Sequence, residues 1–99
     1  MYMWKRTLRT MSSERFLCLR EGQEIAAVDM HYLEGGAAAG TVILLEDAGL
    51  TETEVPSLLH SLDDDMLPGV DLDTGNLTFT VVSGRVLGNF EGAHDDKPA

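Results

Sequence analysis

The sequence is poor in cysteine and in long apolar runs, and each shortage excludes a class of protein. Cys18 is the one cysteine, so no disulfide forms within the chain, which fits a reducing compartment. No apolar run approaches the roughly 20 residues that a membrane-spanning helix requires. A signal peptide is not expected either, because Lys5, Arg6 and Arg9 interrupt the N-terminal apolar residues. We therefore expect a cytoplasmic protein that does not enter a membrane.

Basic residues are also scarce, since 7 Lys and Arg stand against 17 Asp and Glu, for a formal net charge of −10. The few bases are concentrated at one end. Residues 1–20 hold five of them and one acid, a net +4, whereas the other 79 residues hold two bases and 16 acids, a net −14. An acidic body repels phosphate backbones, so we expect no nucleic-acid partner.

The length of 99 residues corresponds to one domain with a modest core. We divide the chain into a basic N-terminal arm, 1–14, a single domain, 15–91, and a polar C-terminal tail, 92–99. The arm is either flexible or docked. Tyr2 and Trp4 would share one side of an extended arm, and aromatic residues placed in this way usually dock on another surface.

Residues 51–66 carry the clearest helical pattern of the chain. The apolar positions repeat at i, i+3, i+4, i+7 and i+11, within an arc of about 100°. They are Val55, Leu58, Leu59, Leu62 and Met66. Thr51 and Glu54 have the spacing of a capping box, and Pro56 is tolerated because it lies near the first turn. This pattern predicts one amphipathic helix.

The other periodic segments alternate with period two, which predicts strands. They are 15–20, 25–33, 41–46, 77–82 and 85–90, with 70–73 as an optional short edge strand. Ser83-Gly84 predicts a hairpin turn between the last two strands. The predicted fold is α+β, with a mainly antiparallel sheet of five or six strands. Its order is β-β-β-α-β-β, and the helix packs on one face.

The first hairpin predicts an apolar surface on the other face of the sheet. With Gly22 and Gln23 as turn residues, Leu19 is opposite Ala26 and Leu17 is opposite Val28. The face away from these residues then carries Phe16, Cys18, Ile25, Ala27, Asp29, His31 and Leu33. One helix about 10 Å wide cannot cover both faces of a sheet roughly 20–25 Å across. We expect a homodimer to bury this face. The arm with Tyr2 and Trp4 could instead fold back over it as a lid, or cross to the neighbouring subunit.

Acidic side chains offer the one candidate ion site. They are Asp63, Asp64, Asp65, Asp71 and Asp73. The segment from Asp71 lacks the third oxygen ligand and the distant glutamate of an EF-hand loop. We therefore interpret the cluster as solvated surface and expect no metal or other cofactor. Asp29 and His31, two apart on one strand face, could form a pair or contribute to a site.

Without a catalytic motif, the sequence favours a small acidic interaction module that is not an enzyme. Its partners would be a second copy of itself and another, unidentified protein, in an adaptor or chaperone-like role. The alternative is a small enzyme or a divalent-ion-binding protein that uses Asp29, His31 and the acids of 63–73. An interaction module should expose an apolar patch, whereas an enzyme should have a cleft where these carboxylates and imidazoles converge.

Overall fold

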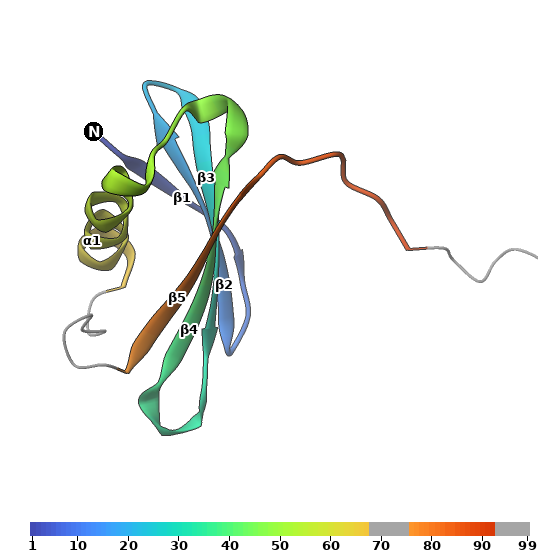
Figure 1. Cartoon of the computed structure of the whole chain (residues 1–99). Coiled ribbons are helices and arrows are strands. Elements are labelled where there is room, and N and C mark those ends of the chain that lie inside the picture. The colour runs from blue at the N-terminus through green and yellow to red at the C-terminus, as the bar shows by residue number, and fades with distance from the viewer. Residues whose placement is uncertain (68–75, 93–99) are drawn as a thin grey trace, which may run out of the picture.

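The computed structural model describes residues 1–67 and 76–92. It contains one five-stranded sheet with a single α-helix lying against one face (Figure 1). The strands are β1 (Met3–Arg9), β2 (Ser13–Arg20), β3 (Gln23–Tyr32), β4 (Ala38–Leu45) and β5 (Leu77–Gly84), and the helix is α1 (Val55–Met66). Short 3₁₀ turns span Glu34–Gly36, Glu46–Ala48 and Glu52–Glu54. The predicted α+β class, with a mostly antiparallel sheet and one packed helix, is confirmed.

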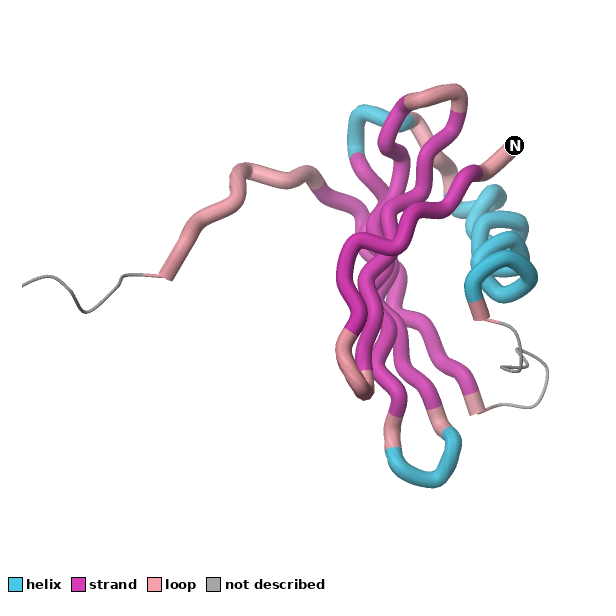
Figure 2. Tube along the Cα trace, turned by 180° about the vertical axis from the view of Figure 1, so that it is seen from behind, coloured by secondary structure: helices cyan, strands magenta, loops and turns pink. Residues whose placement is uncertain are grey.

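The strands lie in the sheet in chain order, β1-β2-β3-β4-β5. The first four form an antiparallel meander, and β5 runs parallel to β4. A parallel neighbour requires a crossover connection, and α1 belongs to it (Figure 2). The helix therefore sits between β4 and β5 in the chain and on one side of the sheet in space.

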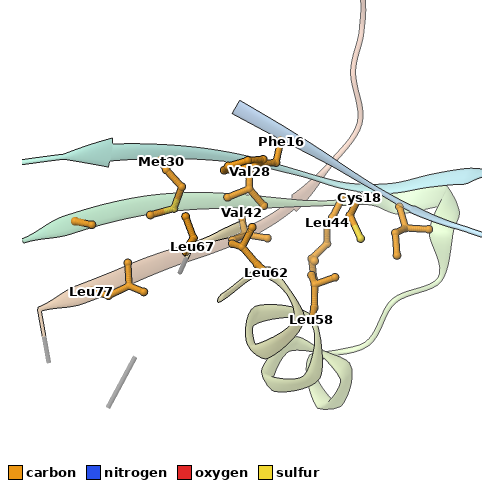
Figure 3. Packing of buried hydrophobic residues seen from close by; sticks show 13 residues of the cluster. Phe16, Cys18, Val28, Met30, Val42, Leu44, Leu58, Leu62, Leu67 and Leu77 are labelled. Atoms are coloured by element: carbon orange, nitrogen blue, oxygen red, sulfur yellow. The ribbon is translucent and has the colours of Figure 1, made fainter. Parts of the chain in front are cut away.

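The core fills the space between α1 and the sheet (Figure 3). Strand residues reach it at every second position, as a half-covered sheet requires. They include Phe16, Cys18, Ala26, Val28, Met30, Val42, Leu44 and Leu77. Leu58 and Leu62 of α1 are fully buried, while Val55, Leu59 and Met66 flank them, half-buried. The predicted helical stripe is therefore present, centred on Leu58 and Leu62.

The start of the helix differs from the predicted capping box. Residues 52–54 form a 3₁₀ turn, and no side chain caps either helical segment. The Thr51 hydroxyl lies 2.8 Å from the hydroxyl of Thr53, and the Glu54 N–H donates to the Thr51 carbonyl at 3.0 Å. The tighter first turn satisfies the backbone that a capping box would have satisfied. Pro56 does lie in the first turn of α1.

The predicted register of the first hairpin is wrong by one residue. The turn residues are Glu21 and Gly22, with φ of 52° and 80°, one position earlier than expected. Both positive φ values suit a two-residue hairpin turn that follows the strand twist. Leu17 consequently pairs with Ala27, and a one-residue shift after Cys18 leaves Ile25 without a directly opposite residue.

This register reverses the predicted faces of β2. Phe16 and Cys18 lie under α1, and Ile25 is also buried, so these three side chains are not on the uncovered face. A slip of one residue moves every side chain of a strand to the other side of the sheet, because strand side chains alternate.

Two strands also lie elsewhere than predicted. The arm supplies β1, and 85–90 forms no strand, so the observed order is β-β-β-β-α-β. The predicted turn at Ser83-Gly84 is absent because β5 continues to Gly84, which pairs with Leu45. The possible strand 70–73 lies outside the described residues.

Candidate interaction surface

A polar cluster closes the end of the core near the β1–β2 turn. Glu14 is only 5% exposed, and it lies on the same side of the sheet as α1. Its Oε1 accepts hydrogen bonds from Arg6 Nε at 2.6 Å and Arg9 Nη1 at 3.1 Å, and its Oε2 accepts one from the Tyr32 hydroxyl. The Arg6 guanidinium also lies 5.5 Å from the ring centroid of Phe16. Three strands are thus joined through one carboxylate.

The protonation of this cluster follows from its contacts. Burial alone would raise the pKa of Glu14, but hydrogen bonds from Tyr32 and Arg6 and the charges of Arg6 and Arg9 together hold that pKa below 4.5. Burial, followed by the bond to Glu14, raises the pKa of Tyr32 to about 12. Both Glu14 oxygens are occupied by protein donors, which makes the carboxylate a link between strands and leaves it poorly placed to act as a base.

The uncovered face of the sheet carries the polar pair that the sequence singled out. Asp29 accepts a hydrogen bond from Arg15 Nε on the neighbouring strand at 2.6 Å, and His31 is exposed on the same face. The acids 63–65 lie on α1, on the opposite side of the sheet. The structure therefore does not bring Asp29 and His31 together with these carboxylates.

Metal ligands do not converge in the part of the chain that the structure describes. There, no group of three or more His, Cys, Asp or Glu side chains is arranged to hold an ion. Asp64 and Asp65 are exposed, whereas Asp71 and Asp73 lie outside the described residues.

Burial raises the pKa of the Cys18 thiol to about 12, which suppresses the thiolate that reactivity requires.

An apolar row crosses the uncovered face, and strand pairing aligns its members. Leu17 pairs with Ala27, Ala27 with Ile43, and Ile43 with Val82 of the edge strand. The first three are partly exposed, and Val82 is 44% exposed. The row reaches the edge of the sheet at β5.

The predicted interface residues are thus divided between the two faces. Ala27, Asp29 and His31 lie on the uncovered face, and Leu33 is exposed just beyond β3. Tyr2 and Trp4 pack against the core instead, and Trp4 Nε1 donates to Ser61 Oγ of α1 at 2.9 Å. The arm is therefore docked, as a strand that helps to hold the helix.

The two edges of the sheet differ in charge. β1 carries Lys5, Arg6 and Arg9, and charged side chains of this kind discourage pairing with another chain. β5 has the sequence LTFTVVSG, with no charge and no proline over eight residues. Its outer side has no strand partner within residues 1–67 and 76–92. The absence of charge was visible in the sequence, but the predicted hairpin with 85–90 had given this edge a second partner.

The segment after β5 also carries exposed apolar residues. Val86, Leu87 and Phe90 are 66%, 80% and 87% exposed. The chain leaves the sheet at Gly84 and extends away from the body of the domain (Figure 1). An open groove of about 450 Å³ lies beside the strand, lined by Leu44, Glu52, Val55, Pro56, Val81, Val82 and Ser83. The last residues of β5 are therefore flanked by a mainly apolar groove, whereas a second groove beside Arg85 and Val86 is lined by the acids Glu24, Glu46 and Asp47.

No helix in the described ranges is long and apolar enough to cross a membrane.

No protein-family model matches the chain, and no curated protein matches it. The solved structures include one similar chain, described as ribosomal-protein-alanine N-acetyltransferase from Brucella melitensis biovar Abortus 2308. Its TM-score is 0.39 at 15% identity, over 81% of this chain and 60% of that one. The present chain thus spans about three-fifths of that protein, and a likeness at this level supports no statement about activity.

Proposed function

We propose that this protein is a non-catalytic interaction module that forms a homodimer along the outer edge of β5. The observation that carries the proposal is an eight-residue edge strand without a charged residue, followed after Arg85 by the exposed side chains of Val86, Leu87 and Phe90.

The chemistry of a sheet edge favours this role. An open edge presents N–H and C=O groups that can bond to the edge of a second sheet, and uncharged β-branched residues do not prevent such pairing. Val82 is one of these residues, and it also ends the apolar row of the uncovered face. Two copies that pair antiparallel along β5 would be related by a two-fold axis, which closes the assembly at two subunits.

The wider role follows from the same surface. A dimer of this kind would be an acidic adaptor or chaperone-like protein, with the uncovered faces of both sheets available to another chain. We place it in the cytoplasm, because its single cysteine is free and buried and needs no oxidising compartment. The Asp29 carboxylate accepts a hydrogen bond from Arg15, and this contact favours the proposal over an enzyme that uses Asp29 and His31.

The test is the mass in solution, measured by light scattering during size exclusion. We expect the wild-type protein to elute at about twice the 10.8 kDa of the chain. Val82→Lys places a charge on the β5 edge and should yield a folded monomer. Thr7→Lys places the same charge on β1 and should leave the dimer intact, with circular dichroism confirming that both variants fold. A wild-type monomer at high concentration, or a dimer indifferent to Val82→Lys, would overturn the proposal.

A further inference from the structure

The segment after β5 can be assigned a specific place in such a dimer. Resting on the proposed function, we infer that residues 85–90 extend β5 and pair antiparallel with the same segment of a second copy. The two-fold axis passes beside Val86. The dimer is then held by a two-stranded ribbon built from 82–90 of each chain.

If β5 continues beyond Gly84, Val86 and Phe90 fall on the uncovered face of the sheet. Successive strand residues point to opposite faces, so an extended continuation of β5 puts Val86 and Phe90 on the face of Val82. That face is the uncovered one, and Val82 ends the row of Leu17, Ala27 and Ile43 there. All residues of 85–90 are exposed, so the segment is available to a second copy.

The register centred on Val86 places apolar side chains of the two copies opposite one another on the uncovered face. Directly opposite residues in an antiparallel pair lie on the same face and are close neighbours. With Val86 on the axis, Val82 is opposite Phe90 of the second copy, and Val86 is opposite its own copy. Gly84 then lies opposite Gly88. The register thus pairs β-branched with aromatic or β-branched side chains and leaves no large apolar group facing a polar one on the uncovered face.

This ribbon also continues the apolar row across the axis. Phe90 of the second copy would cover Val82, which is 44% exposed in the single chain, and would itself leave water, where it is 87% exposed. Registers centred further back in β5, for example on Gly84, place Phe90 against Thr78 and lose this contact. Centring on Val86 is therefore the register that covers Phe90 with an apolar partner on the uncovered face.

Cross-linking through a new cysteine tests the register. Opposite Cα atoms in an antiparallel pair lie about 4.5–5.5 Å apart, within the range that a disulfide spans. Val86→Cys should therefore form an intermolecular disulfide under mild oxidation, read on a non-reducing gel. The matched control is Leu87→Cys, whose two copies would be diagonal neighbours about 7–8 Å apart. We expect it to cross-link at least tenfold more slowly. Wild type, whose Cys18 is buried, should not cross-link.

The outcomes separate this inference from the dimer itself. Equal cross-linking of Val86→Cys and Leu87→Cys, or none in a protein that light scattering shows to be dimeric, would overturn the ribbon and leave the β5 dimer standing. A wild-type monomer would overturn both. As a second readout, Phe90→Ala should raise the dimer dissociation constant at least tenfold, while Asn89→Ala leaves it within twofold. An unchanged constant in Phe90→Ala would also contradict the ribbon.

Discussion

Glu14 shows how a charged residue can be retained inside so small a core. A buried carboxylate is costly unless it is paired and hydrogen-bonded. Arg6, Arg9 and Tyr32 supply three donors to it, from β1 and β3 on either side of β2. The arginines of the basic N-terminal region are thus used internally, and Arg15 and Arg20 likewise contact Asp29 and Glu54.

We expect Glu14→Gln to lower the free energy of unfolding at pH 7 by about 1–3 kcal/mol, the range for hydrogen bonds to a charged group. The two arginines keep 41% and 63% of their side-chain surface exposed, which places the cost toward the lower end. Because the folded-state pKa of Glu14 lies below the unfolded value, its stabilisation is present above about pH 4.5. It is lost as the pH falls through the folded-state pKa.

Urea denaturation at pH 7 and at about pH 3.5 measures this difference. The gap between wild type and Glu14→Gln should shrink at the lower pH. Asp29→Asn is the control, since its partner Arg15 is exposed and such surface pairs contribute about 0–1 kcal/mol. An equally large cost of Glu14→Gln at both pH values would show that the carboxylate charge is not what stabilises the cluster.

At the scale of elements, α1 is fastened to the sheet by its apolar stripe and by two polar contacts. Leu58 and Leu62 project into the core (Figure 3), and Trp4 of β1 donates to Ser61 of α1. Arg20 of β2 lies 3.6 Å from Glu54 at the beginning of the helix. The arm and the helix therefore stabilise each other, although 57 residues separate Trp4 from Ser61.

Leu62→Ala should remove a fully buried side chain and leave a cavity, at a cost of about 2–5 kcal/mol. Leu59→Ala should cost less, because Leu59 is only half-buried at the edge of the stripe. The exposed neighbour His60→Ala should cost under about 0.5 kcal/mol. Denaturant midpoints give the ranking, and a larger loss for Leu59→Ala than for Leu62→Ala would show that the helix packs in another phase.

Strand β4 illustrates a constraint that acts between elements. A Cβ on Gly40 would lie 2.6 Å from Met30 Sδ and 2.7 Å from Phe79 Cδ1. Two large side chains from the flanking strands thus pass over Gly40, and only glycine leaves room for both. Ala38, Ala39 and Gly40 are small, yet they belong to β4, where they pair with β3 on one side and β5 on the other.

For the whole molecule, the dominant property is its formal net charge of −10. Two acidic copies repel each other, and the repulsion reaches farther at low salt, where the Debye length is about 30 Å at 0.01 M against about 8 Å at 0.15 M. We expect the dimer dissociation constant to fall by roughly three- to tenfold between these salt concentrations. Sedimentation equilibrium in sodium chloride measures it.

The opposite trend would point to a different assembly. If the dissociation constant rises with salt, attraction between unlike charges holds the copies together. That outcome would indicate contact between the basic β1 edge, with Lys5, Arg6 and Arg9, and an acidic surface of the neighbour. Pairing along the uncharged β5 edge would then be contradicted.

The elements that the sequence predicted well are those set by local periodicity. The helical stripe of 51–66 is present because its spacing matches the 3.6-residue repeat, whatever surrounds it. Most strands, and the mainly antiparallel α+β class, follow from alternation and from short connections between neighbouring runs. The tight turn at Gly22 was recognised, although its position was one residue off.

Which face and which partner each strand has was decided only by the tertiary structure. The one-residue difference at Glu21 and Gly22 moved Phe16 and Cys18 from the uncovered face into the core, because strand side chains alternate and a single slip exchanges the faces. The segment 77–84 alternates equally well for either direction, and the α1 crossover set it parallel to β4, with an open outer edge. The local sequence pattern determines whether a segment forms a strand. Which strands it pairs with depends on contacts between distant parts of the chain. The candidate interaction surface lies at the β5 edge, which those contacts left without a partner.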